Sequence, residues 1–107
     1  MTELLYEIQM HTLIGIKYGS MYAKILDDEV KGIMNLMKQS TSFYGKINKN
    51  GDCEIQGQII SLTKTIPYQA IGKIKKETVE LDMHTNQGEF HIAGKGTQNE
   101  KILQLYC

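Results

Sequence analysis

The sequence predicts an all-β fold, an up-and-down antiparallel meander of about eight strands closed into a small calycin-like barrel. Three observations predict it: apolar and polar residues alternate in short segments, turn residues separate the segments, and glycine recurs between apolar flankers. The recurring glycines are Gly32, Gly45, Gly57, Gly72 and Gly94. Because strand side chains alternate between two faces, these glycines share the buried face, where they let strands bend or leave space.

The expected strands are residues 5–13, 16–26, 29–38, 42–48, 53–62, 65–75, 78–84 and 89–95. In the first, Tyr6, Ile8 and Met10 alternate with polar residues, and the second ends at an acidic turn. The third also carries apolar residues at helical spacing, but Gly32 favours a strand. Residues 101–106 form either a ninth short strand or a tail.

The later strands are bounded by clear turn signals. Asn50-Gly51 between the fourth and fifth segments is a strong hairpin signal, because both residue types accept positive φ. The sixth strand carries the chain's one proline, and the seventh places Val79, Leu81 and Met83 inward. A flat sheet of this length would leave two edges and one face uncovered, so closure into a single domain (1–107, core 5–97) is expected.

Two segments of the chain resemble each other. Residues 7–15 (EIQMHTLIG) align without gaps with residues 80–88 (ELDMHTNQG), and five of the nine positions are identical. A duplication would produce this pattern. Convergence on a strand that ends in a tight turn would produce it too, and we favour convergence.

The composition narrows the range of partners. Twelve lysines balance twelve acidic residues, and the chain contains no arginine, which argues against nucleic acid as a partner. A lysine-rich composition of an AT-rich genome is an alternative cause. No segment reaches the roughly 20 apolar residues of a membrane helix, and no signal peptide is evident, so we expect no membrane partner and a cytoplasmic location.

The sequence offers few candidates for chemistry. Cys53 is expected to be buried and Cys107 is terminal, so the cysteines suggest neither a disulfide framework nor a zinc site. His11, His84 and His91 fall on polar faces of strands that meet where the barrel closes; they are a metal or pH-sensitive site, or three solvated side chains. No phosphate loop or nucleotide fingerprint occurs, and we expect no enzymatic activity, cofactor or metal.

The strand–glycine units carry a family resemblance. On residues 43–47, 50–57, 66–72 and 88–94, the chain resembles a group of small bacterial β-barrel proteins, found mostly in Firmicutes, that has no assigned activity. The resemblance covers most of residues 5–97. More broadly, the architecture looks like the calycin class, which includes lipocalins and avidins. The chain has no tryptophan, so neither the lipocalin Gly-x-Trp start nor the avidin tryptophan-lined pocket is present.

Two functions are expected. The first is a non-catalytic barrel that binds a small apolar or amphipathic molecule, with walls formed by Tyr6, Met34, Phe43, Tyr68, Met83 and Phe90. The alternative is a solid-core interaction module or homodimer, with Ile60 and Leu62 at the interface. Five tyrosines either surround the mouth of a pocket or are present simply because tyrosine favours strands, namely Tyr6, Tyr18, Tyr22, Tyr44 and Tyr68. The volume inside the barrel distinguishes the two functions.

Overall fold

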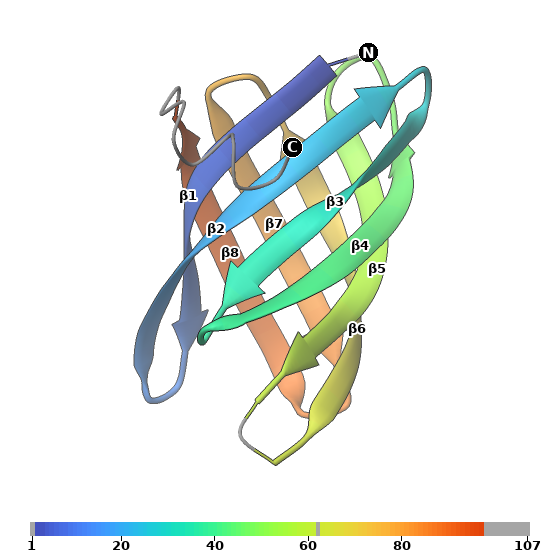
Figure 1. The fold of residues 1–107 in the computed structure, drawn as a ribbon. Helices are drawn as coiled ribbons and strands as arrows, with labels where there is room; N and C mark the ends of the chain where they lie inside the picture. The colour runs from blue at the N-terminus through green and yellow to red at the C-terminus, as the bar shows by residue number, and fades with distance from the viewer. Residues whose placement is uncertain (1, 62, 98–107) are drawn as a thin grey trace.

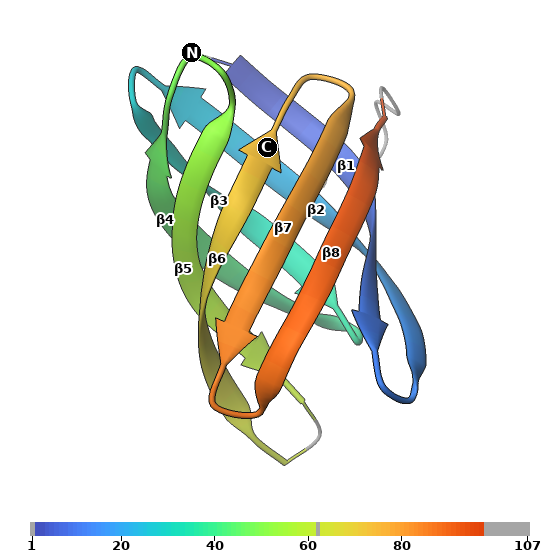
Figure 2. The same cartoon turned by 180° about the vertical axis from the view of Figure 1, so that it is seen from behind.

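A computed structural model describes residues 2–61 and 63–97. They form one closed barrel of eight antiparallel strands, in chain order, as Figures 1 and 2 show from opposite sides. The strands are β1 (Thr2–Thr12), β2 (Gly15–Leu26), β3 (Glu29–Leu36), β4 (Gln39–Ile47), β5 (Asp52–Ile60), β6 (Thr65–Ile74), β7 (Thr78–Thr85) and β8 (Gly88–Gly96). The predicted fold class is confirmed. Within the described residues no helix is long and apolar enough to cross a membrane.

The barrel closes between its first and last strands. β1 pairs with β8 from Tyr6–Gly96 to His11–His91. All remaining pairings join strands that are consecutive in the chain. Two strands begin earlier than predicted. β1 begins at Thr2 rather than at residue 5. β4 begins at Gln39 rather than at residue 42, because Met37 and Lys38, both at positive φ, make a tight turn. The segment 101–106 lies outside the described residues.

The glycines of the predicted series lie in strands, on the inward side. A Cβ atom at Gly32, Gly45 or Gly72 would lie only 1.8–2.0 Å from a carbonyl oxygen of a neighbouring strand. At these points two backbones approach more closely than any side chain permits. Gly19 of β2 makes the same approach to Asn35, at 1.9 Å, and was missed because only one of its flankers on that face, Met21, is apolar.

The centre of the barrel is packed with side chains. The inward residues form one continuous buried cluster to which every strand contributes. Tyr6, Phe43, Leu81 and Met83 are each at most 1% exposed. The middle of the barrel is therefore a core rather than an open chamber, and the hollows described below lie toward its ends.

The two ends of the barrel are built differently. The upper end, as drawn in Figure 1, carries the β2–β3, β4–β5 and β6–β7 turns; the lower end carries the other four connections. At the lower end the β4–β5 pairing stops at Phe43–Gly57, although β4 extends to Gln39 and β5 to Ile60. We call this gap, between residues 39–42 and 58–60, the split.

Candidate ligand-binding mouth

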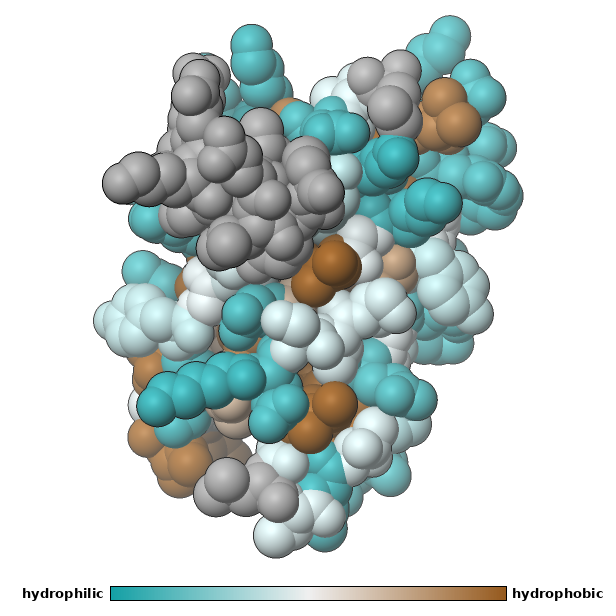
Figure 3. All heavy atoms as spheres, viewed as in Figure 1, coloured by the Kyte–Doolittle hydropathy of each residue, from teal (hydrophilic) through white to brown (hydrophobic). Residues whose placement is uncertain are grey.

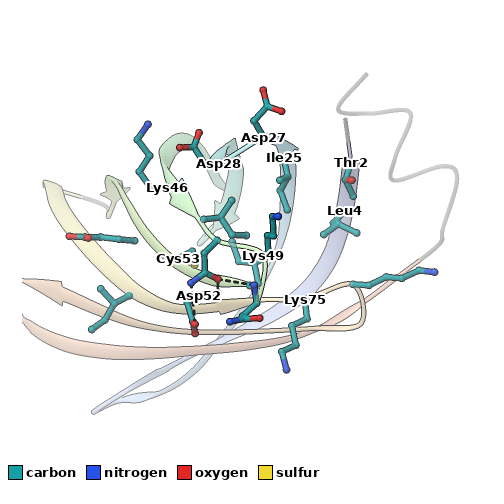
Figure 4. Close-up of a pocket in the computed structure, with 18 of the residues that line it drawn as sticks. Thr2, Leu4, Ile25, Asp27, Asp28, Lys46, Lys49, Asp52, Cys53 and Lys75 are labelled. Atoms are coloured by element: carbon teal, nitrogen blue, oxygen red, sulfur yellow. Dashed lines mark hydrogen bonds between the residues drawn. The ribbon is translucent and has the colours of Figure 1, made fainter.

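The upper end of the barrel is hollowed, and we call this hollow the upper mouth. Figure 4 shows the residues that line it. Its floor consists of inward-facing apolar side chains at the upper ends of five strands, namely Leu4, Ile25, Ile47, Cys53 and Ile74. Ile47, Cys53 and Ile74 are buried, whereas Leu4 and Ile25 are only partly buried against the core. The mouth therefore presents an apolar surface that the described residues cover incompletely.

The rim of the upper mouth is charged. Two rim residues form exposed ion pairs, Lys46 with Glu29 at 3.3 Å and Asp52 with Lys73 at 3.6 Å, which contribute little to stability. Lys49 makes no ion pair within the described residues. Lys49 and Ile25 both line the hollow, and Figure 4 draws their side chains near each other, whereas Asp27 points away. Lys49 is thus a candidate cation for contact with a bound molecule.

The β4–β5 turn holds Lys49 in place. The Oδ1 atom of Asn48 accepts hydrogen bonds from the backbone N–H groups of Asn50, at 2.9 Å, and Asp52, at 3.0 Å. Gly51 supplies the positive φ, +88°, that the turn requires. The Gly51 carbonyl also accepts a hydrogen bond from Ile74 N–H at 2.9 Å, tying this turn to β6. The backbone of this turn is therefore held by hydrogen bonds to the Asn48 side chain and to β6.

Tyr6 and Cys53 lie beneath the mouth. The Tyr6 hydroxyl donates a hydrogen bond to the carbonyl of Lys75 in the β6–β7 turn. Burial raises the pKa of Tyr6 well above its ordinary value, and burial with nearby Asp52 raises the pKa of Cys53 to about 11. The thiol is protonated at neutral pH, so it is a poor nucleophile. The arrangement is suited to binding rather than to covalent chemistry.

The sequence-predicted wall residues lie mainly in the core. Five of the six are at most 3% exposed, namely Tyr6, Met34, Phe43, Tyr68 and Met83. The sixth, Phe90, is partly buried against the core. Of these six, Tyr68 borders a hollow at the lower end. Their ligand role stays a prediction. The floor of the upper mouth was missed, although a usable signal existed: each floor residue is the first or the last inward apolar residue of its strand.

The other predicted clusters are only partly assembled. His11 and His91 face each other across β1 and β8, with ring centroids 6.0 Å apart, whereas His84 contacts Glu89 at 2.9 Å. Among the described residues no group of three His, Cys, Asp or Glu side chains could hold a metal ion. The tyrosines do not form a ring, because Tyr6, Tyr22 and Tyr68 are buried while Tyr18 and Tyr44 are exposed.

The predicted interface falls at the edge of the described chain. Ile60 is half-buried beside the fully packed Ile59, as expected for neighbours on opposite faces of a strand. Leu62 lies outside the described residues. The subunit contact at these two positions stays a prediction.

This geometry defines the protein as an eight-stranded up-and-down β-barrel with a hollow at its upper end. Comparison with solved structures gives the same class. A redesigned β-barrel, b11L5F_LGL, matches with a TM-score of 0.60 and 14% identity, covering 89% of this chain and 90% of that one. The redesigned barrel mFAP1, bound to DFHBI, matches with a TM-score of 0.57, 12% identity and coverage of 88% and 92%.

These similarities concern the fold alone, since the identities are low. A third redesigned barrel, mFAP0, also bound to DFHBI, matches with a TM-score of 0.56 and 13% identity, covering 88% of this chain and 95% of that one. No protein-family model and no curated protein matches the chain. The resemblance to the bacterial barrel group therefore stays a prediction.

Proposed function

We propose that this barrel binds a small amphipathic molecule in the upper mouth, with its apolar part on the floor and an acidic group near Lys49. The observation that carries the proposal is an apolar floor that the described residues cover incompletely, beside a lining lysine that has no ion-pair partner among those residues. Two similar designed barrels are bound to DFHBI, which supports the capacity of this architecture to hold a small molecule.

The energetics favour an apolar contribution to affinity. Each buried methylene contributes about 0.8 kcal/mol, so an alkyl chain that buries about five of them gains about 4 kcal/mol before the cost of association. An exposed lysine adds a smaller, salt-sensitive attraction. We therefore expect affinity to rise with chain length and to fall moderately with added salt.

The test uses dodecanoate as the probe, followed by amide chemical shifts in NMR. We expect shifts centred on Ile25, Ile47 and Cys53, and binding weakened about threefold by Lys49→Gln, which corresponds to a surface charge contribution of about 0.6 kcal/mol. The matched control is Lys64→Gln, which removes a lysine from the β5–β6 connection at the opposite end. Shifts confined to other surfaces, or none, would contradict the proposal.

A second candidate function, self-association, is favoured by a comparison of two turns. The β1–β2 and β7–β8 turns share one hydrogen-bonding framework. The hydroxyl of the threonine (Thr12 or Thr85) donates to the carbonyl of the glycine three residues later and accepts a hydrogen bond from the backbone N–H two residues later. The tips differ, since Leu13-Ile14 replaces Asn86-Gln87 and both apolar side chains are exposed. Figure 3 shows apolar surface at the lower left, where Figure 1 places the β1–β2 turn.

The turn framework does not require the apolar tip, so the tip is available for contact with a second copy of the chain. Light scattering tests this candidate. Self-association that Leu13→Asn with Ile14→Gln abolishes, and that Ile60→Ser leaves unchanged, would support a contact through the tip. A wild-type protein that is monomeric at micromolar concentration would contradict it.

A further inference from the structure

The split is a second hollow, in the wall near the lower end of the barrel. β4 and β5 pair from Ile47–Cys53 to Phe43–Gly57, and no register pair joins residues 39–42 to residues 58–60. The outer strands remain paired, because β3 holds β4 as far as Gln39 and β6 holds β5 as far as Ile60. The wall thus opens between two otherwise well-supported strands.

Tyr68 borders this hollow, and its hydroxyl is buried without a hydrogen-bond partner. Tyr68 is 3% exposed, and among the described residues its hydroxyl is the single buried side-chain group without a hydrogen-bond partner. A buried hydroxyl without a partner costs about as much as a lost hydrogen bond. Tyr6, equally buried, donates to Lys75 instead. The Tyr68 hydroxyl is therefore a vacant donor and acceptor.

Gly57 creates the space that the Tyr68 hydroxyl occupies. Tyr68 pairs directly with Gly57, and a Cβ atom at Gly57 would lie 2.8 Å from the hydroxyl and 2.9 Å from the carbonyl oxygen of Ser42. The hydroxyl thus lies close to the point where the β4–β5 pairing ends. Because no ladder bonds join the strands below that point, local opening costs least there.

The lining of the split contains no lysine, aspartate or glutamate; it includes His84, whose Nδ1 atom lies 2.9 Å from Glu89 Oε1. The lining is rich in amide and hydroxyl groups, and includes Thr41, Ser42, Gln56, Gln58, Gln69 and Asn86. Tyr44 adds an aromatic ring that is 61% exposed. The absence of lysine, aspartate and glutamate from this lining disfavours an ionic ligand, while amides beside an exposed ring suit a neutral polyhydroxylated one.

We propose that the split is a binding site for a neutral sugar, one hydroxyl of which hydrogen-bonds to the Tyr68 hydroxyl while a C–H face of the sugar ring packs on Tyr44. The site is distinct from the upper mouth and does not depend on the proposed function there. Side-chain amides of Gln56 and Gln58 on β5 are within the same lining and complete the polar contacts.

The experiment titrates the full chain with glucose, galactose and N-acetylglucosamine, observed by amide chemical shifts in NMR. At least one sugar is expected to shift Ser42, Gly57 and Gln58, and Tyr68→Phe is expected to weaken that binding about tenfold, the effect of one lost hydrogen bond. Tyr6→Phe is the matched control, because it removes a buried hydroxyl far from the split and should leave sugar affinity unchanged.

Two results would overturn the proposal. The first is the absence of shifts at the split with every sugar up to its solubility limit. The second is an equal affinity in Tyr68→Phe and the wild type, which would mean that the hydroxyl does not meet the ligand. A crystal soaked in the best-binding sugar that holds only a water molecule at Tyr68 would overturn it as well. Tyr68→Phe removes an unsatisfied group, so the variant should fold.

Discussion

The upper and lower ends of the barrel differ in how completely their backbone and side-chain groups are hydrogen-bonded. At the upper end, Ile47 N–H donates to the Asp28 carbonyl and Ile74 N–H to the Gly51 carbonyl, both at 2.9 Å, so neighbouring turns are linked. The hydroxyl of Tyr6 is satisfied there. At the lower end, β4 and β5 separate and the hydroxyl of Tyr68 has no partner.

This difference indicates where rigidity and adaptability lie. A linked rim keeps the upper mouth in one shape, which reduces the ordering cost of binding. Strand ends without ladder bonds at the lower end open at lower cost, which is a property of ligand-binding regions in many folds. The four predictions that follow test this contrast, beginning with the largest expected effect.

The first prediction compares glycines from the two regions. The atoms nearest a Cβ at Gly45 are all backbone, beginning with the Glu54 carbonyl oxygen at 2.0 Å, so Gly45→Ala must move a strand. At Gly57 the nearest atom is the Tyr68 hydroxyl, at the end of a side chain. Urea denaturation should show a loss of about 3 kcal/mol or more for Gly45→Ala and about 1–2 kcal/mol for Gly57→Ala. Gly57→Val, with two further carbons, should cost up to about 3 kcal/mol.

A double variant sharpens this comparison. If the Tyr68 hydroxyl causes part of the Gly57→Ala loss, Tyr68→Phe should relieve that part, and the two substitutions should be non-additive. Equal losses at Gly45 and Gly57 would mean that the lower end is as tightly constrained as the rest of the wall.

The second prediction concerns alkaline pH. Burial raises the pKa of Tyr6 and Tyr68 above the ordinary value of 10.0, and that of Cys53 from 9.0 to about 11. These groups ionise more readily in the unfolded chain. Their contribution to stability is therefore complete below about pH 9 and declines as the pH rises, by up to about 1.4 kcal/mol per pH unit for each group.

Denaturation midpoints measured between neutral pH and pH 11 check this slope. Tyr6→Phe and Tyr68→Phe should each flatten the decline above pH 10 by a similar amount, because burial is the main cause at both ends. A slope that neither substitution changes would show that these hydroxyls ionise equally easily in the folded barrel.

The third prediction compares the same two substitutions at neutral pH. Tyr6→Phe leaves the Lys75 carbonyl without its donor and should cost about 1–2 kcal/mol in urea denaturation. Tyr68→Phe removes a group without a partner and should be neutral or stabilising by up to about 1 kcal/mol. Similar losses in both variants would remove the contrast between the two ends, since they would imply that an ordered water already satisfies Tyr68.

The sequence predicted the fold well because closure follows from local patterns. Alternation placed Tyr6, Ile55 and Leu81 inward, and Asn50-Gly51 marked a hairpin, so strand order required no long-range information. The glycine series was also predicted, but its physical reason was not: the close approach at Gly45 depends on the path of β5, which belongs to a different segment.

The sites were predicted less completely, because they depend on where pairing stops. The pattern of β4 and β5 gives no sign that the ladder ends at Phe43–Gly57, and hence none that Tyr68 borders a hollow. The floor of the upper mouth depends on which inward residues come first or last in each strand. Large inward side chains such as Met34 and Phe43 were expected to form ligand-binding walls; the structure buries them in the core of the barrel, and their ligand role stays a prediction.

The smallest expected effect on stability lies at the two lower turns with matching frameworks. Replacing Leu13-Ile14 with Asn-Gln transfers the tip of the β7–β8 turn to the β1–β2 turn, without altering the threonine and glycine hydrogen bonds. Gly15 and Gly88 keep their positive φ of 128° and 120°. Because both apolar side chains are exposed in the barrel, the graft should change the free energy of unfolding by no more than about 0.5 kcal/mol. A larger loss in dilute, monomeric protein would show that the tip packs within its own chain, and it would then have no role as a contact for a second copy.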